Sequence, residues 1–137
     1  MLLAGGSVGV SAASRHWRIA MFLVAATVAG AMFNTGLKQA FARARPDLVP
    51  REVIVTNASF PSGHAFGAAM IYLTVAALLS GRIRQPAARA MLLVLAIGVT
   101  AAVCVSRVAL GVHGPSDVLA GWAAGAAWAL ASWMIAD

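Results

Sequence analysis

The sequence predicts an all-α integral membrane protein, a helical bundle of about four transmembrane helices with its polar loops gathered on one face. Of its 137 residues, 61% are hydrophobic and only 10% are charged, whereas soluble domains carry roughly 45–50% apolar and about 25% charged residues. A soluble chain of this length has too little polar surface to cover so many apolar side chains. The apolar residues also gather in four long runs, which places the chain in a membrane.

Each apolar run is 15 to 19 residues long, close to the roughly 20 residues with which a helix spans a bilayer. Backbone groups in lipid must be paired within their own segment, so we expect every run to be a helix. In chain order the runs cover residues 19–36, 65–79, 90–105 and 118–136. Residues 1–13 are too short for a span and could be the tail of a helix. Residues 1–14 are small and weakly apolar and lack the charged start of a signal peptide.

Small residues recur at a spacing of four in two places, Gly63-x-x-x-Gly67 and Gly121-x-x-x-Gly125. Such pairs let helices approach closely, so we expect a packed bundle and a single domain.

Two predicted loops are separated by two spans and therefore lie on the same side of the membrane. The first covers residues 38–60 and leads into Pro61-Ser62-Gly63-His64, and the second covers residues 106–117. The short basic loop over residues 82–89 and the C-terminus lie on the opposite side.

The side chains on the shared side suit a phosphate ester. Lys38, Arg45 and Arg107 can neutralise the anion, and each arginine can bind two oxygens. Ser62 and Gly63 stand where the second helix begins, and the N–H groups and dipole of a helix start favour an anion. Together these donors can stabilise the charge that develops during phosphoryl transfer.

Phosphoryl transfer also needs a nucleophile and an acid, and two histidines are present on this side. Imidazole titrates at about pH 6.5, so one neutral and one protonated histidine can coexist. Asp117 follows His113 by four residues, with Pro115 between them, so in a helical turn the carboxylate can hold one ring nitrogen. The other nitrogen would attack phosphorus, while His64 would protonate the leaving oxygen.

These residues resemble the three signature motifs of the type 2 phosphatidic acid phosphatase superfamily, which also includes vanadium haloperoxidases. The motifs here are Lys38-x6-Arg45-Pro46, Pro61-Ser62-Gly63-His64 and Ser106-Arg107-x5-His113-x3-Asp117, and the similarity covers residues 17–136. The resemblance implies a lipid phosphatase that needs no metal or other cofactor and works through a phosphohistidine intermediate. It implies His113 as nucleophile, Asp117 as its partner, His64 as general acid, and phosphate binding by Lys38, Arg45, Ser62, Gly63 and Arg107.

The sequence departs from the family in two respects. Membrane members usually have six spans, whereas four are found here. We therefore expect residues 1–137 to form one membrane phosphatase domain in which the first two helices are absent or represented only by residues 1–13. Gly114 also follows His113 where an aromatic residue is common.

Other functions fit the sequence less well. A metal site is disfavoured because no H-E-x-x-H spacing occurs and three cations would repel a divalent ion. The apolar content argues against a haloperoxidase, and the scattered basic residues present no face for a nucleic acid. A membrane protein that binds lipid headgroups without chemistry, or an inactive truncated family member, remains the alternative.

The expected partners are a lipid phosphate and the bilayer, and the sequence leaves the oligomeric state open. It also leaves open which lipid is the substrate: phosphatidic acid, phosphatidylglycerol phosphate, a polyprenyl pyrophosphate or a lipid A phosphate.

Basic residues also predict the orientation. The two sides carry five each: Arg15, Arg18, Arg82, Arg84 and Arg89 on one, and Lys38, Arg43, Arg45, Arg51 and Arg107 on the other. If Lys38, Arg45 and Arg107 bind substrate, the first side has more free charges and faces the cytoplasm. We therefore expect a bacterial inner-membrane protein with its active-site loops facing the periplasm or exterior.

Overall fold

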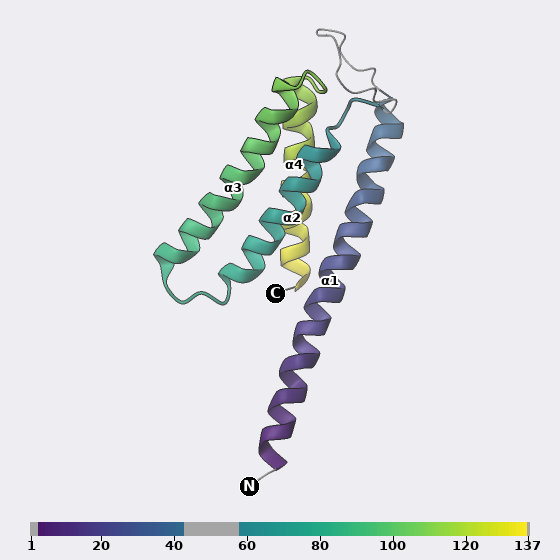
Figure 1. Ribbon diagram of the computed structural model, residues 1–137. Helices are drawn as coiled ribbons and strands as arrows, with labels where there is room; N and C mark the ends of the chain where they lie inside the picture. The colour runs from purple at the N-terminus through teal and green to yellow at the C-terminus, as the bar shows by residue number, and fades with distance from the viewer. Residues whose placement is uncertain (1–2, 43–57, 137) are drawn as a thin grey trace.

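The computed structural model describes the backbone of residues 3–42 and 58–136, and their side chains from Trp17 onward. Four helices follow one another in this part of the chain: α1 (Leu3–Phe41), α2 (Gly63–Ser80), α3 (Pro86–Ala109) and α4 (Pro115–Ala136), as Figure 1 shows. Neither described stretch contains a strand. The predicted all-α class is therefore confirmed.

All four helices contain a segment that is long and apolar enough to cross a membrane. These segments, Trp17–Phe41 in α1 and the whole of the other three helices, contain 18 to 25 residues, or about 27 to 38 Å at the helical rise. A bilayer has a hydrocarbon core of about 30 Å. Large apolar side chains such as Val94, Leu119 and Ile135 are exposed on the outside of the bundle, where lipid can cover them. The chain is thus a membrane protein, as predicted.

The helices extend beyond the apolar runs, so the predicted loop boundaries are wrong. Lys38 lies in the last turn of α1 and Arg107 in the last turn of α3, whereas Asp117 lies in the first turn of α4. Arg89 likewise belongs to α3 and not to the loop before it. Hydropathy identifies only the part of a helix that lies in lipid. The ends of the helix continue into the polar interface, and hydropathy assigns their polar residues to loops.

Helix α2 is at the centre and packs against each of the other three helices. Its closest neighbour is α4, because Gly121 and Gly125 have no side chains: a Cβ atom on Gly121 would collide with the backbone of Ser62, and one on Gly125 with the carbonyl oxygen of Phe66. The close approach predicted for this pair is confirmed. The same prediction is wrong for Gly67, because no neighbouring helix approaches this glycine and it faces open space.

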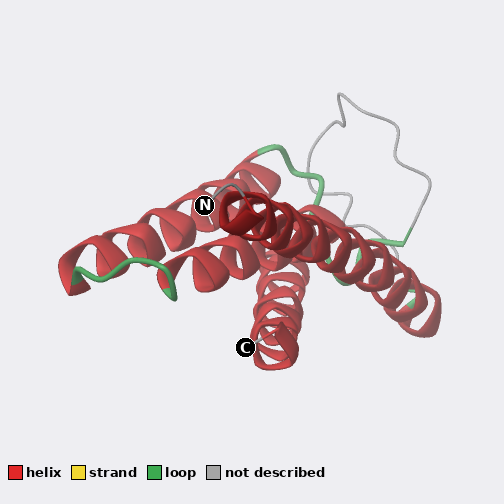
Figure 2. Cartoon of the chain, turned by 90° about the horizontal axis from the view of Figure 1, so that it is seen from below, coloured by secondary structure: helices red, strands yellow, loops and turns green. Residues whose placement is uncertain are grey.

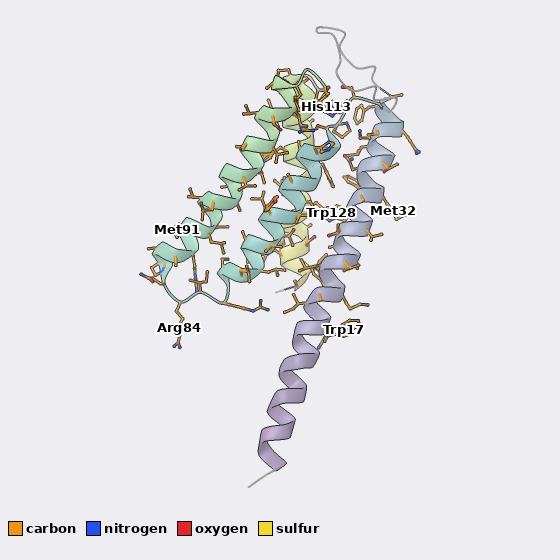
Figure 3. All side chains as sticks on the ribbon, in the orientation of Figure 1. Trp17, Met32, Arg84, Met91, His113 and Trp128 are labelled. Carbon is orange, nitrogen blue, oxygen red and sulfur yellow. The ribbon has the colours of Figure 1, made fainter. Side chains whose placement is uncertain are left out.

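Helix α1 is attached to α4 through Trp128, which lies midway along the bundle (Figure 3). The indole Nε1 donates a hydrogen bond to the carbonyl oxygen of Ala26 at 3.1 Å, and the ring stacks on Phe33 with 5.4 Å between centroids. Seen from below, α2 and α3 run side by side while α4 leaves them toward its C-terminus (Figure 2). The helices therefore converge at the opposite end, where α1 and α3 finish and α2 and α4 begin.

Candidate active site

Four helix ends meet at one end of the bundle, and they bring together those predicted site residues that the structure describes. Figure 3 shows His113 at this end and Arg84 at the other. The beginnings of α2 and α4 are joined directly, since the backbone N–H of Ser62 donates to the carbonyl oxygen of Asp117 at 2.9 Å. The common side inferred from the parity of the spans is therefore confirmed.

The short connection between α3 and α4 positions His113. Helix α3 ends at Ala109, and Gly111 lies just beyond it with a positive φ of 64°, which suits a residue without a side chain. Helix α4 begins at Pro115, whose fixed φ favours the first helical position. The imidazole of His113 between them is buried, and its Nδ1 lies 3.8 Å from Oδ2 of the buried Asp117.

Two further donors hold the Asp117 carboxylate in place. Its Oδ2 accepts hydrogen bonds from the backbone N–H of Gly114 at 3.1 Å and from the hydroxyl of Ser59. Asp117 in the third position of α4 thus pairs with the residue that precedes the helix, as in one half of a capping box. The same oxygen faces His113, so the carboxylate and the imidazole are oriented together.

Ser59 is a residue that the sequence reasoning missed. It is completely buried, and its hydroxyl bonds to a carboxylate 58 positions away in the chain. Its only sequence signal is its place two residues before Pro61, and that place does not indicate Asp117 as its partner.

The start of α2 has the form expected of a helix N-terminus. Ser62 is completely buried and is the N-cap, with its Oγ accepting from the N–H of Ala65 at 3.5 Å. Because its own N–H is used by Asp117, the donors of the first turn begin with Gly63. His64 follows in this turn with an exposed side chain.

Lys38 reaches from α1 to the start of α2. Its Nζ donates to the carbonyl oxygen of Ala58 at 3.1 Å, and lies 3.9 Å from the point that a Cβ on Gly63 would occupy. The absence of a side chain on Gly63 therefore keeps the helix start open to this ammonium group. An anion held there would meet a cation and the positive end of the helix dipole together.

Of the two arginines predicted to bind phosphate, the structure describes Arg107. Arg107, half-buried in the last turn of α3, donates from Nε to the hydroxyl of Ser106 at 3.2 Å. Arg45 lies outside the described residues. Among the residues that are described, no three His, Cys, Asp or Glu side chains are grouped as metal ligands.

Comparison with known proteins links this chain to a family. Residues 19–137 match the model of the PAP2 superfamily. The chain is 38% identical to phosphatidylglycerophosphatase B of Bacillus subtilis (strain 168) over 95 residues, which is 69% of this chain and 46% of that protein. It also resembles the crystal structure described as the first transmembrane PAP2 type phosphatidylglycerolphosphate phosphatase from Bacillus subtilis, with a TM-score of 0.77 and 30% identity over 85% of this chain and 58% of that one. The chain thus spans about half the length of these relatives.

Proposed function

The chain belongs to the PAP2 superfamily, and we propose that it hydrolyses the terminal phosphate of a membrane lipid through a phosphohistidine intermediate on His113. The observation that carries the proposal is the buried pair of His113 and Asp117 at the common end of the four helices. The pair lies beside a helix N-terminus and an ammonium group, which are the parts that phosphoryl transfer requires.

In the first step, Nε2 of His113 attacks phosphorus while Asp117 faces Nδ1 and stabilises the positive charge that forms on the ring. The bond between phosphorus and the lipid oxygen breaks, and protonated His64 gives its proton to that oxygen. Water then attacks the phosphohistidine, and the now neutral His64 accepts a proton from it. Inorganic phosphate leaves, and both histidines return to their starting states.

The proposed phosphate site is formed by Lys38 and by the first turn of α2. The Lys38 ammonium lies beside Gly63, and the N–H groups of Gly63 and His64 would meet the phosphoryl oxygens. The N–H of Ser62 is bonded to the carbonyl oxygen of Asp117. Ser62 would therefore support phosphate binding as the N-cap of α2 and not through its own N–H. Arg107 and Arg45 would complete the neutralisation of the phosphate.

We propose phosphatidylglycerophosphate as the first substrate to test, because both relatives are named for it. The family motifs do not discriminate among lipids that carry a terminal phosphate. A panel should therefore also contain phosphatidic acid, a polyprenyl pyrophosphate and a lipid A phosphate. In this proposal, residues 1–137 form a single domain that acts on these lipids.

The test is phosphate release by purified protein in detergent, measured for the four lipids with and without EDTA. We expect release from phosphatidylglycerophosphate that EDTA does not reduce, and none from His113→Ala. Loss of activity in EDTA that a divalent metal restores would contradict the metal-independent mechanism. Binding of the lipids without any release would instead support a headgroup-binding protein.

We also propose that the site faces the periplasm or exterior of a bacterial inner membrane. The exposed residues Arg18, Arg82 and Arg84 lie away from the site, and unpaired positive charges favour the cytoplasmic side.

A further inference from the structure

Asn34 is a buried polar residue that the mechanism above does not use. Its side chain lies in the membrane-spanning part of α1 and has 8% of its surface exposed. Within the described residues, its Oδ1 is fully buried and accepts no hydrogen bond. Buried amide oxygens are almost always paired, and in a membrane no bulk water is present to replace the missing donor. An unpaired oxygen of this kind points to a ligand.

The position of Asn34 indicates which ligand. It precedes Lys38 by four residues on α1, so the two side chains lie on the same face of the helix. Its Nδ2 lies 3.2 Å from the point that a Cβ on Gly63 would occupy, the same point that is 3.9 Å from the Lys38 Nζ. The amide therefore borders the proposed phosphate site, one helical turn farther along α1 from its end.

The NH2 group and the Oδ1 atom of the amide bind different groups on a ligand. The NH2 group of Asn34 can donate to a phosphate oxygen, but Oδ1 can only accept. A phosphate dianion has no proton to donate, so it cannot satisfy this oxygen. A free hydroxyl on the alcohol part of the substrate can, provided that it is close to the phosphoester. Phosphatidic acid has no such hydroxyl, because both remaining glycerol oxygens are acylated.

We propose, on the basis of the function proposed above, that Asn34 Oδ1 accepts a hydrogen bond from a substrate hydroxyl next to the phosphoester. The preferred substrates are then lipid phosphates whose phosphorylated group is a glycerol with a free hydroxyl. Asn34 is a specificity-determining residue in this account, and Lys38 and His113 bind the phosphate whether or not the hydroxyl is present.

The experiment compares two lipids that differ in one atom: phosphatidylglycerophosphate and an analogue in which 1,3-propanediol replaces the phosphorylated glycerol. One hydrogen bond in such a site is worth about five- to tenfold in kcat/KM. We expect the wild-type protein to prefer the hydroxylated lipid by this factor. Asn34→Leu, which has a similar volume and no acceptor, should reduce the ratio to about one. Thr35→Val is the matched control and should keep the wild-type ratio, because Thr35 is exposed and its hydroxyl donates to the carbonyl oxygen of Ala31 in its own helix.

Equal rates of the wild-type protein with the two lipids would overturn the proposal, whether or not Asn34→Leu folds. So would an equal loss of both rates in a folded Asn34→Leu protein, because that would show a structural role or a bound water. If the wild-type protein releases no phosphate from either lipid, the proposed hydrolysis fails. The role of Asn34 is then decided by the dissociation constants of the two lipids in the His113→Ala background, where the same five- to tenfold preference is expected and equal values would contradict it.

Discussion

His113 Nδ1 lies 3.8 Å from Asp117 Oδ2, although the histidine precedes α4 and the aspartate belongs to its first turn. The separation is slightly longer than a hydrogen bond, and such contacts commonly shorten when substrate binds. Asp117 is fixed by Ser59 and Gly114 before any substrate arrives. The carboxylate is thus preorganised, and positive charge formed on the imidazole during attack would meet it directly.

Asp117→Asn should preserve the shape of the site and remove the charge that faces His113. We expect kcat for lipid phosphate hydrolysis to fall by at least about a hundredfold, because the amide cannot stabilise the charged ring. The midpoint of thermal unfolding should stay close to the wild-type value. An activity within a factor of two of the wild-type value would show that the pair does not assist the attack.

Ser59→Ala tests the residue that orients this carboxylate. Loss of a hydrogen bond to a buried charged group costs about 1.5–3 kcal/mol of stability, and we expect kcat to fall about tenfold as Asp117 loses its position. Ser80→Ala is the matched control, because its hydroxyl bonds to the carbonyl of Ala77 at the other end of α2. Equal effects of the two substitutions on kcat would rule out a special role for Ser59.

The sequence predicted the helices and their common end, but not the contacts that complete the site. Hydropathy and the parity of the spans suffice to bring Ser62 and Asp117 to one membrane face. The bond between Ser59 and Asp117 joins positions 58 apart, and the burial of Asn34 depends on how α1 lies against Gly63. Such contacts arise from the packing of helices in three dimensions, which local patterns do not describe.

Local sequence patterns also fail to locate the ends of the helices. Lys38 was predicted in a loop because it follows the apolar run, yet it lies in the last turn of α1. A charged residue at the end of a membrane helix can stay helical and extend its side chain into the interface. Similarly, the spacing of Gly63 and Gly67 was the same as that of Gly121 and Gly125, but only packing determines which glycine meets a neighbouring helix.

Gly121→Ala tests the close packing of α2 and α4. The new methyl group would meet the backbone of Ser62, so the helices must separate and shift the Ser62–Asp117 contact. We expect a destabilisation of about 1–3 kcal/mol and a clear loss of activity, measured by thermal unfolding and phosphate release. Gly67→Ala, where nothing lies within 4 Å, should leave both unchanged or slightly raise the stability. The opposite ranking would contradict the packing described.

The orientation is tested at Arg84, which is exposed in the turn between α2 and α3 at the far end from His113 (Figure 3). In a Cys104→Ser background, which removes the only native thiol, a cysteine is introduced by Arg84→Cys. We expect a membrane-impermeant maleimide to label it only after the cells are opened. Labelling of intact cells would place this turn outside and the site in the cytoplasm.

The most direct test of the central proposal is detection of the phosphorylated enzyme. The protein is mixed with lipid that carries ³²P in its terminal phosphate, quenched with base after milliseconds, and analysed for bound label and its position. We expect a phosphoryl group that is stable to base, labile to acid and located on His113, with none on His113→Ala. Phosphate release by the wild-type protein without any labelled histidine, or undiminished turnover by His113→Ala, would contradict the mechanism.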